Sequence, residues 1–78
     1  MPRILVINPN SSLPCEAGIE AAIASLRGTA GVGIDVVSLP EGPPAIYSWR
    51  DWHAAVEAIC RCIEQESADA YVIACASD

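Results

Sequence analysis

Two short aliphatic runs constrain the fold of this chain more than any other feature. Residues 3–8 read Arg-Ile-Leu-Val-Ile-Asn, and residues 70–75 read Ala-Tyr-Val-Ile-Ala-Cys. Neither run alternates polar with apolar side chains, a pattern typical of parallel strands that are covered on both faces. The sequence therefore favours a buried parallel sheet over a half-solvated antiparallel one.

Helical and strand patterns alternate between these runs. We predict a first helix over residues 13–27, begun by Ser11 or Ser12 as N-cap and closed by Gly28. A strand over residues 32–39 contains Asp35, which favours an edge position or an exposed face. The apolar positions of the first helix repeat at helical spacing: Ile19, Ala22, Ile23 and Leu26.

A second helix should begin at Ser48-Trp49-Arg50-Asp51, which has the form of a capping box. Its predicted apolar stripe consists of Trp52, Ala55, Val56, Ile59 and Ile63. Glu57 and Arg61 form an i,i+4 ion pair in this helix. Between the second strand and this helix, residues 40–47 form a loop that three prolines stiffen.

The order β-α-β-α-β predicts one parallel sheet, because right-handed crossovers place all three strands together. The expected strand order is 2-1-3, the arrangement of one flavodoxin-like half. The third strand would then lie at an edge although its composition suits a central position. We therefore expect the fold to be incomplete without a following strand and a second half. Functional groups in such sheets lie beyond the carboxyl ends of the strands.

Charge and cysteine content narrow the class of protein. The chain has 78 residues with 4 basic and 10 acidic side chains, a net charge of -6. This sign argues against nucleic-acid and anionic-membrane partners, and no apolar run approaches the ~18 residues of a membrane span. Four cysteines without a recognisable secretory leader indicate reduced thiols in a cytoplasmic protein.

Two segments at the carboxyl ends of predicted strands carry candidate chemistry. The turn that contains Asn8, Asn10, Ser11 and Ser12 offers amides and hydroxyls at a positive helix end, which suits an anion or a polar carbonyl. An ordinary turn with an N-cap explains the same residues. Cys75 is either a general base or nucleophile or a small buried hydrophobe.

The remaining reactive side chains have structural interpretations. Cys60 and Cys62 are roughly 200° apart on a helix and have no matching second cluster, so a zinc site is not expected. Cys15 is expected to pack on the apolar face of the first helix, and His53 to be solvated or to cap the second. Trp49 and Trp52 are expected to pack against the loop, although Tyr47 and Trp49 also suit a pocket wall.

Three segments together resemble the hydantoin racemase group of the Asp/Glu racemase superfamily: ILVINPNSS at 4–12, GPPAIYSWRD at 42–51 and DAYVIACASD at 69–78. The resemblance implies two similar α/β halves with the active site between them, one cysteine from each half and no cofactor. Residues 1–78 would form the first part of the N-terminal domain, without the remainder of the enzyme.

The resemblance also implies roles for single residues. Cys75 matches the catalytic cysteine of the first half, and Asp78 the acid often found near it. Backbone N–H groups of Ala76 and Ser77 would face the substrate. The residues that match the loop holding the polar groups of the substrate are Asn8, Asn10, Ser11 and Ser12. The chain departs from the family at Pro14-Cys15-Glu16, where a Met-Thr pair is common.

The expected activity is racemisation of a small molecule at a carbon next to a carbonyl, most simply a hydantoin or allantoin-type ring, by two cysteines without metal. Maleate isomerase, an Asp/Glu racemase and a non-catalytic flavodoxin-like binding module are the alternatives. We expect a homo-oligomer at full length and no activity from residues 1–78 alone.

Overall fold

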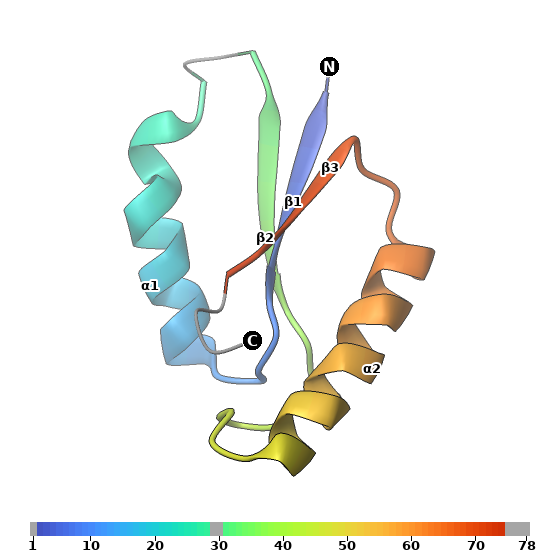
Figure 1. The fold of residues 1–78 in the computed structure, drawn as a ribbon. Helices are drawn as coiled ribbons and strands as arrows, with labels where there is room; N and C mark the ends of the chain where they lie inside the picture. Colours follow the sequence, from blue (N-terminus) through green and yellow to red (C-terminus); the bar gives the residue numbers. More distant parts are fainter. Residues whose placement is uncertain (1, 29–30, 75–78) are drawn as a thin grey trace.

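The computed structural model describes residues 2–28 and 31–74, which form a three-stranded sheet with two long helices (Figure 1). The predicted order of elements is confirmed. The elements are β1 (Arg3–Asn8), α1 (Leu13–Ile23), a short 3₁₀ turn (Ala24–Leu26), β2 (Gly33–Ser38), α2 (Trp49–Gln65) and β3 (Ala70–Ile73). The first helix is shorter than predicted, because its last turn tightens into the 3₁₀ turn before Gly28 closes it at a φ of 81°.

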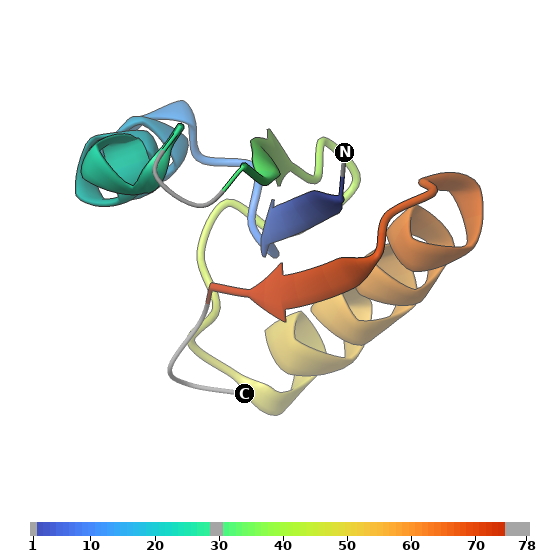
Figure 2. The ribbon, with the colours of Figure 1, turned by 90° about the horizontal axis from the view of Figure 1, so that it is seen from above.

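The sheet is parallel, and its strand order is β2-β1-β3, as predicted. Leu5 of β1 lies level with Asp35 of β2 and with Tyr71 of β3. Asp35 is exposed on an edge strand, in agreement with its interpretation from sequence. The two helices lie on opposite sides of the sheet (Figure 2).

The core lies between the sheet and α2. It is formed by Leu5, Ile7, Leu39, Ala58, Ile59 and Cys62. The predicted stripe of α2 is only partly buried: Ala55 and Ile59 are buried, but Val56 is 38% exposed. Ala58 and Cys62, which lie outside that stripe, complete the packed face instead. Burial raises the pKa of the Cys62 thiol, so it is held protonated in this core.

The other helix, α1, contributes no buried residue. Ala22, Leu26 and Cys15 are exposed, which contradicts the prediction that they pack. The physical reason is position: α1 lies alongside the edge strand β2, so little of its circumference meets the sheet (Figure 2). In addition, several residues of α1 have small side chains or none and reach little of the strand surface: Ala17, Gly18, Ala21 and Ala22.

Both helices begin with a serine cap, as predicted. The Ser12 hydroxyl accepts the Cys15 N–H at 3.3 Å, and the Ser48 hydroxyl accepts the Asp51 N–H at 3.1 Å. The Asp51 carboxylate accepts the Tyr47 N–H at 3.0 Å, and this bond is the main reason that the pKa of Asp51 is lowered. Within residues 2–28 and 31–74, no helix has the length and apolar composition needed to cross a membrane.

Candidate functional site

Asn8 is the most deeply buried polar side chain at the carboxyl edge of the sheet. It lies at the end of β1 and is 2% exposed. Its Nδ2 donates to Asn10 Oδ1 at 2.9 Å, to Ser38 Oγ at 3.0 Å and to the Ser12 carbonyl at 3.3 Å. One amide group therefore joins the turn after β1 to the end of β2.

The side-chain amide of Asn10 has its oxygen hydrogen-bonded, whereas its Nδ2 group has no partner among the described residues. Its Oδ1 accepts from Asn8 Nδ2 and also from the Ser12 N–H at 2.9 Å, the geometry of an Asx turn. Its Nδ2 makes no hydrogen bond within the described part of the chain. Because the side chain is half-buried and its carbonyl is held, the Nδ2 donor is fixed in direction.

The two serines of the turn have different roles. Ser12 is the N-cap of α1, so its hydroxyl is already engaged. Ser11 donates its backbone N–H to the Pro43 carbonyl at 3.0 Å, whereas its hydroxyl has no partner among the residues that the structure describes. Asn10 Nδ2 and Ser11 Oγ are thus side-chain groups of this turn that make no hydrogen bond within residues 2–28 and 31–74.

The loop of residues 40–47 is locked against this turn. The Leu39 N–H donates to the Asn10 carbonyl at 3.2 Å, and the Gly42 N–H donates to the Leu39 carbonyl at 2.9 Å. A Cβ at Gly42 would lie 2.5 Å from the Pro9 carbonyl oxygen. Glycine is therefore required where the two loops meet. The sequence predicted a loop over residues 40–47 but gave no sign of its contacts with Pro9 and Ser11.

The third strand runs alongside β1 towards the same edge. Ile73 lies level with Ile7, and the Ala74 N–H donates to the Ile7 carbonyl at 2.9 Å. The candidate catalytic residue Cys75, its neighbours Ala76 and Ser77, and the acid Asp78 lie outside the described residues. Their roles stay predictions.

The aromatic side chains near α2 do not form a closed pocket wall. Tyr47 is 91% exposed and Trp49 is 77% exposed, so the expectation that Trp49 packs against the loop is wrong. Trp52 meets Trp49 edge to face, with ring centroids 5.8 Å apart. His53 Nδ1 donates to the Trp49 carbonyl at 2.7 Å, and its side chain is exposed, in agreement with its interpretation as a solvated residue.

Cysteines and acidic residues do not gather into a metal-binding cluster in the described part of the chain. Cys60 is exposed and Cys62 is buried, so the two thiols point to different environments. Among residues 2–28 and 31–74, no group of three or more His, Cys, Asp or Glu side chains is placed to hold a metal ion. At the carboxyl edge of the sheet, the described residues thus supply neutral hydrogen-bond donors and the N-terminal end of α1.

Comparison with known proteins places these features in a family. The family model described as Asp/Glu/Hydantoin racemase matches residues 4–78. A hydantoin racemase of Pseudomonas sp. (strain NS671) is 38% identical over 79 residues, which is 97% of this chain and 31% of the relative. The chain thus spans about a third of the length of this curated relative. No solved structure matches the chain significantly.

Proposed function

This chain belongs to the Asp/Glu/hydantoin racemase family, and we propose that the full-length protein is a cofactor-independent racemase of hydantoin-type rings. In this proposal residues 1–78 form the first part of its N-terminal half. The C5 carbon of such a ring lies between a carbonyl and a ring nitrogen, and the adjacent carbonyl acidifies the C5 proton enough for a thiolate to remove it. The name of the Pseudomonas relative supports this ring over an open-chain amino acid or maleate.

The observation that carries the proposal is the fixed turn after β1. Its Asn10 Nδ2 and Ser11 Oγ make no hydrogen bond within the described residues, whereas Asn8 Nδ2, Asn10 Oδ1 and Ser12 Oγ are engaged in the network of the turn. Donors held in place before the reaction stabilise the charge that develops on a carbonyl oxygen as the adjacent carbon loses its proton. We assign these two groups to a ring carbonyl of the substrate.

Cys75 is the proposed base on one face of the substrate. It follows β3 in sequence, and β3 runs towards the same edge as the Asn10 turn. A thiolate on one face removes the C5 proton, and a protonated thiol on the opposite face returns one to the same carbon. The second thiol would come from the second half. Backbone N–H groups of Ala76 and Ser77 are proposed as further donors to the ring oxygen, beside the Asn8-anchored turn.

The test of the thiol pair is Cys75→Ser in the full-length protein. Serine keeps the size of the side chain, but its hydroxyl is far less acidic than a thiol of pKa ~8.5. Racemisation of both enantiomers should fall by orders of magnitude, whereas exchange of the C5 proton with deuterated solvent should persist for one enantiomer only. Optical rotation and deuterium uptake are followed separately for each enantiomer. Racemisation of both at the wild-type rate would make Cys75 a packing residue.

The test of the donor turn is Asn10→Asp. The carboxylate keeps an oxygen for Asn8 Nδ2 and for the Ser12 N–H, but replaces the Nδ2 donor by an acceptor. We expect kcat/KM to fall about tenfold or more while the turn stays folded, since a donor to a developing oxyanion contributes ~10²–10³ in rate. Ser11→Ala removes the second donor alone and should have a smaller effect in the same direction. An unchanged kcat/KM in both variants removes this turn from the site.

A further inference from the structure

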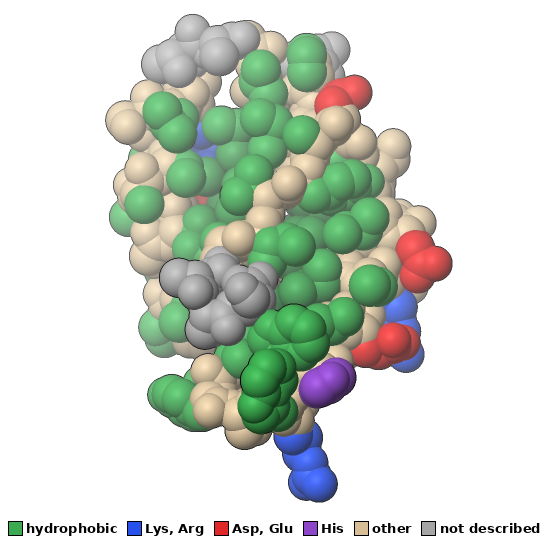
Figure 3. Space-filling view, in the orientation of Figure 1, with side chains coloured by type: hydrophobic (Ala, Val, Ile, Leu, Met, Phe, Trp, Pro, Cys, Tyr) green, Lys and Arg blue, Asp and Glu red, His purple; other side chains and the backbone are tan. Residues whose placement is uncertain are grey.

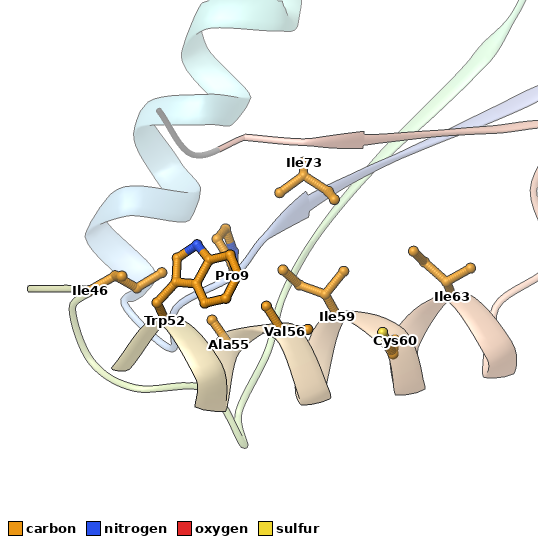
Figure 4. A pocket seen from close by; sticks show the side chains of 9 residues that line it. All are labelled: Pro9, Ile46, Trp52, Ala55, Val56, Ile59, Cys60, Ile63 and Ile73. Carbon is orange, nitrogen blue, oxygen red and sulfur yellow. The ribbon is translucent and has the colours of Figure 1, made fainter. Parts of the chain in front are cut away.

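An apolar groove runs between α2 and β3, and one end of it reaches Pro9 of the donor turn. It has a volume of about 360 Å³, and its lining residues, all apolar except Cys60, come mainly from one side of α2. The others are Ile73 of β3, Pro9 and Ile46. Figure 4 shows the α2 side chains directed towards Ile73 across the groove. Figure 3 shows hydrophobic side chains gathered over this part of the surface. Val56 and Ile73 are exposed there, so the groove is open to solvent.

The spacing of the lining residues indicates what kind of partner fits the groove. The lining residues of α2 recur at intervals of three, four and seven residues, which is the pattern of a helix-packing stripe. They include Trp52, Val56, Ile59, Cys60 and Ile63. The stripe extends over roughly 16 Å of α2, or about three turns. A single ring-sized ligand would cover only part of that length, whereas a second helix laid along α2 would cover all of it.

The direction of the crossovers indicates which helix of the full-length chain could lie along this groove. The chain passes from β2 through α2 to β3 and crosses β1 on the way, so α2 lies on one defined face of the sheet. The outer edge of β3 pairs with no strand in the described part of the chain. A strand added there by another right-handed crossover continues in the same direction, so its connecting helix must lie on the α2 face.

We propose that this groove is the docking surface for the first helix that follows β3 in the full-length chain. The length of the Pseudomonas relative leaves about two thirds of such a chain to supply it. The Pro9 and Trp52 end of the groove lies where the chain leaves β3, at the carboxyl edge, and α2 runs from there antiparallel to the strands. The docked helix therefore begins beside the candidate site. This inference concerns the fold and holds for any substrate.

Cys60 provides a natural reporter, because its thiol lines the groove and is exposed without the docked helix. In the native full-length protein, alkylation of Cys60 by a maleimide should be at least about tenfold slower than in the urea-unfolded protein, since a covered thiol reacts only after local opening. Peptide mass spectrometry gives the rate at this site. Rapid native alkylation of Cys60 would overturn the proposal.

A matched pair of substitutions tests the same surface by stability. Val56→Lys places a charge in the groove, whereas Ala54→Lys places it on an exposed position two residues earlier that does not line the groove. Val56→Lys should lower the thermal midpoint of the full-length protein clearly, and Ala54→Lys should hardly change it. Equal midpoints in the two variants would overturn the proposal.

The same measurements separate the other occupants. If a second copy of the chain covered the groove, Cys60 protection would fall on dilution and Val56→Lys would dissociate an oligomer in analytical ultracentrifugation. If the substrate covered it, Cys60 would be protected only when a hydantoin is added. Either result contradicts docking within the chain. Protection that depends on neither concentration nor ligand, together with a destabilised Val56→Lys variant, supports it.

Discussion

At each end of β1 one polar side chain makes several contacts with neighbouring segments, but the two sets of contacts differ in chemistry. At the amino end, Arg3 is partly exposed and ionic. Its guanidinium contacts the Asp35 carboxylate at 2.8 Å and donates to the Ser67 carbonyl at 2.7 Å. At the carboxyl end, Asn8 is buried and neutral, and its amide donates only to neutral acceptors.

Because of this difference, the carboxyl end of β1 depends more on a single residue than the amino end does. Water competes for the exposed Arg3 contacts, so solvent replaces most of what a substitution removes. The Asn8 amide is 2% exposed, so solvent has little access to replace the hydrogen bonds that its loss removes. A neutral anchor also adds no charge next to the turn that we assign to the substrate. The contacts at the carboxyl end thus fix the geometry of the turn after β1, whereas those at the amino end join β1 to neighbouring segments.

The largest effect is expected for Asn8→Ala in the full-length protein. Ser38 Oγ, Asn10 Oδ1 and the Ser12 carbonyl lose a shared donor whose hydrogen bonds are partly buried. We expect the free energy of unfolding to fall by about 2 to 3 kcal/mol, measured by urea unfolding.

Asn8→Asp is the control of similar shape. Its carboxylate faces acceptors and donates to none, so the variant should be unstable at neutral pH. It should recover in part in mild acid, where the protonated acid has an O–H to donate. A wild-type unfolding midpoint for Asn8→Ala would mean that the anchor is not Asn8.

The next effect is expected at the contact between the two loops. Gly42→Ala adds a Cβ at 2.5 Å from the Pro9 carbonyl oxygen, so the loops must separate. We expect a loss of about 1 to 2 kcal/mol and a parallel fall in kcat/KM. Gly18→Ala, in α1 with open space around it, should instead stabilise the protein by up to ~1 kcal/mol through helix propensity. Opposite signs in calorimetry confirm the contact, and equal signs refute it.

Local patterns predicted the elements of this fold because aliphatic runs, serine caps and glycine stops act over a few residues. They did not divide the roles of Asn8, Asn10, Ser11 and Ser12. That division depends on Ser38, 30 residues from Asn8, and on the Pro43 carbonyl. The helical pattern of α1 likewise gave no sign that an edge position would leave it uncovered.

A smaller effect is expected from the helix cap. Ser12→Ala removes the acceptor of the Cys15 N–H and should cost ~1 kcal/mol. Ser11→Ala removes a hydroxyl without a partner in the described part of the chain, so its unfolding midpoint should stay at the wild-type value. The pair thus separates the capping role from the binding role within one turn. A larger stability loss in Ser11→Ala than in Ser12→Ala would reverse the assignment.

The smallest effect is expected at the amino end, for Arg3→Met. The guanidinium is partly exposed, and its ion pairs with Asp35 and Glu66 are screened by salt. The variant should therefore unfold slightly earlier than wild type in dilute buffer, and this difference should shrink in concentrated sodium chloride. The Asn8→Ala difference should not shrink, because the hydrogen bonds of Asn8 are uncharged and partly buried. Measuring both variants across a salt series separates the two attachments by chemistry as well as by size. A salt-independent loss in Arg3→Met, as large as that in Asn8→Ala, would mean that the Ser67 hydrogen bond carries the amino end and that the contrast between the two ends of β1 is false.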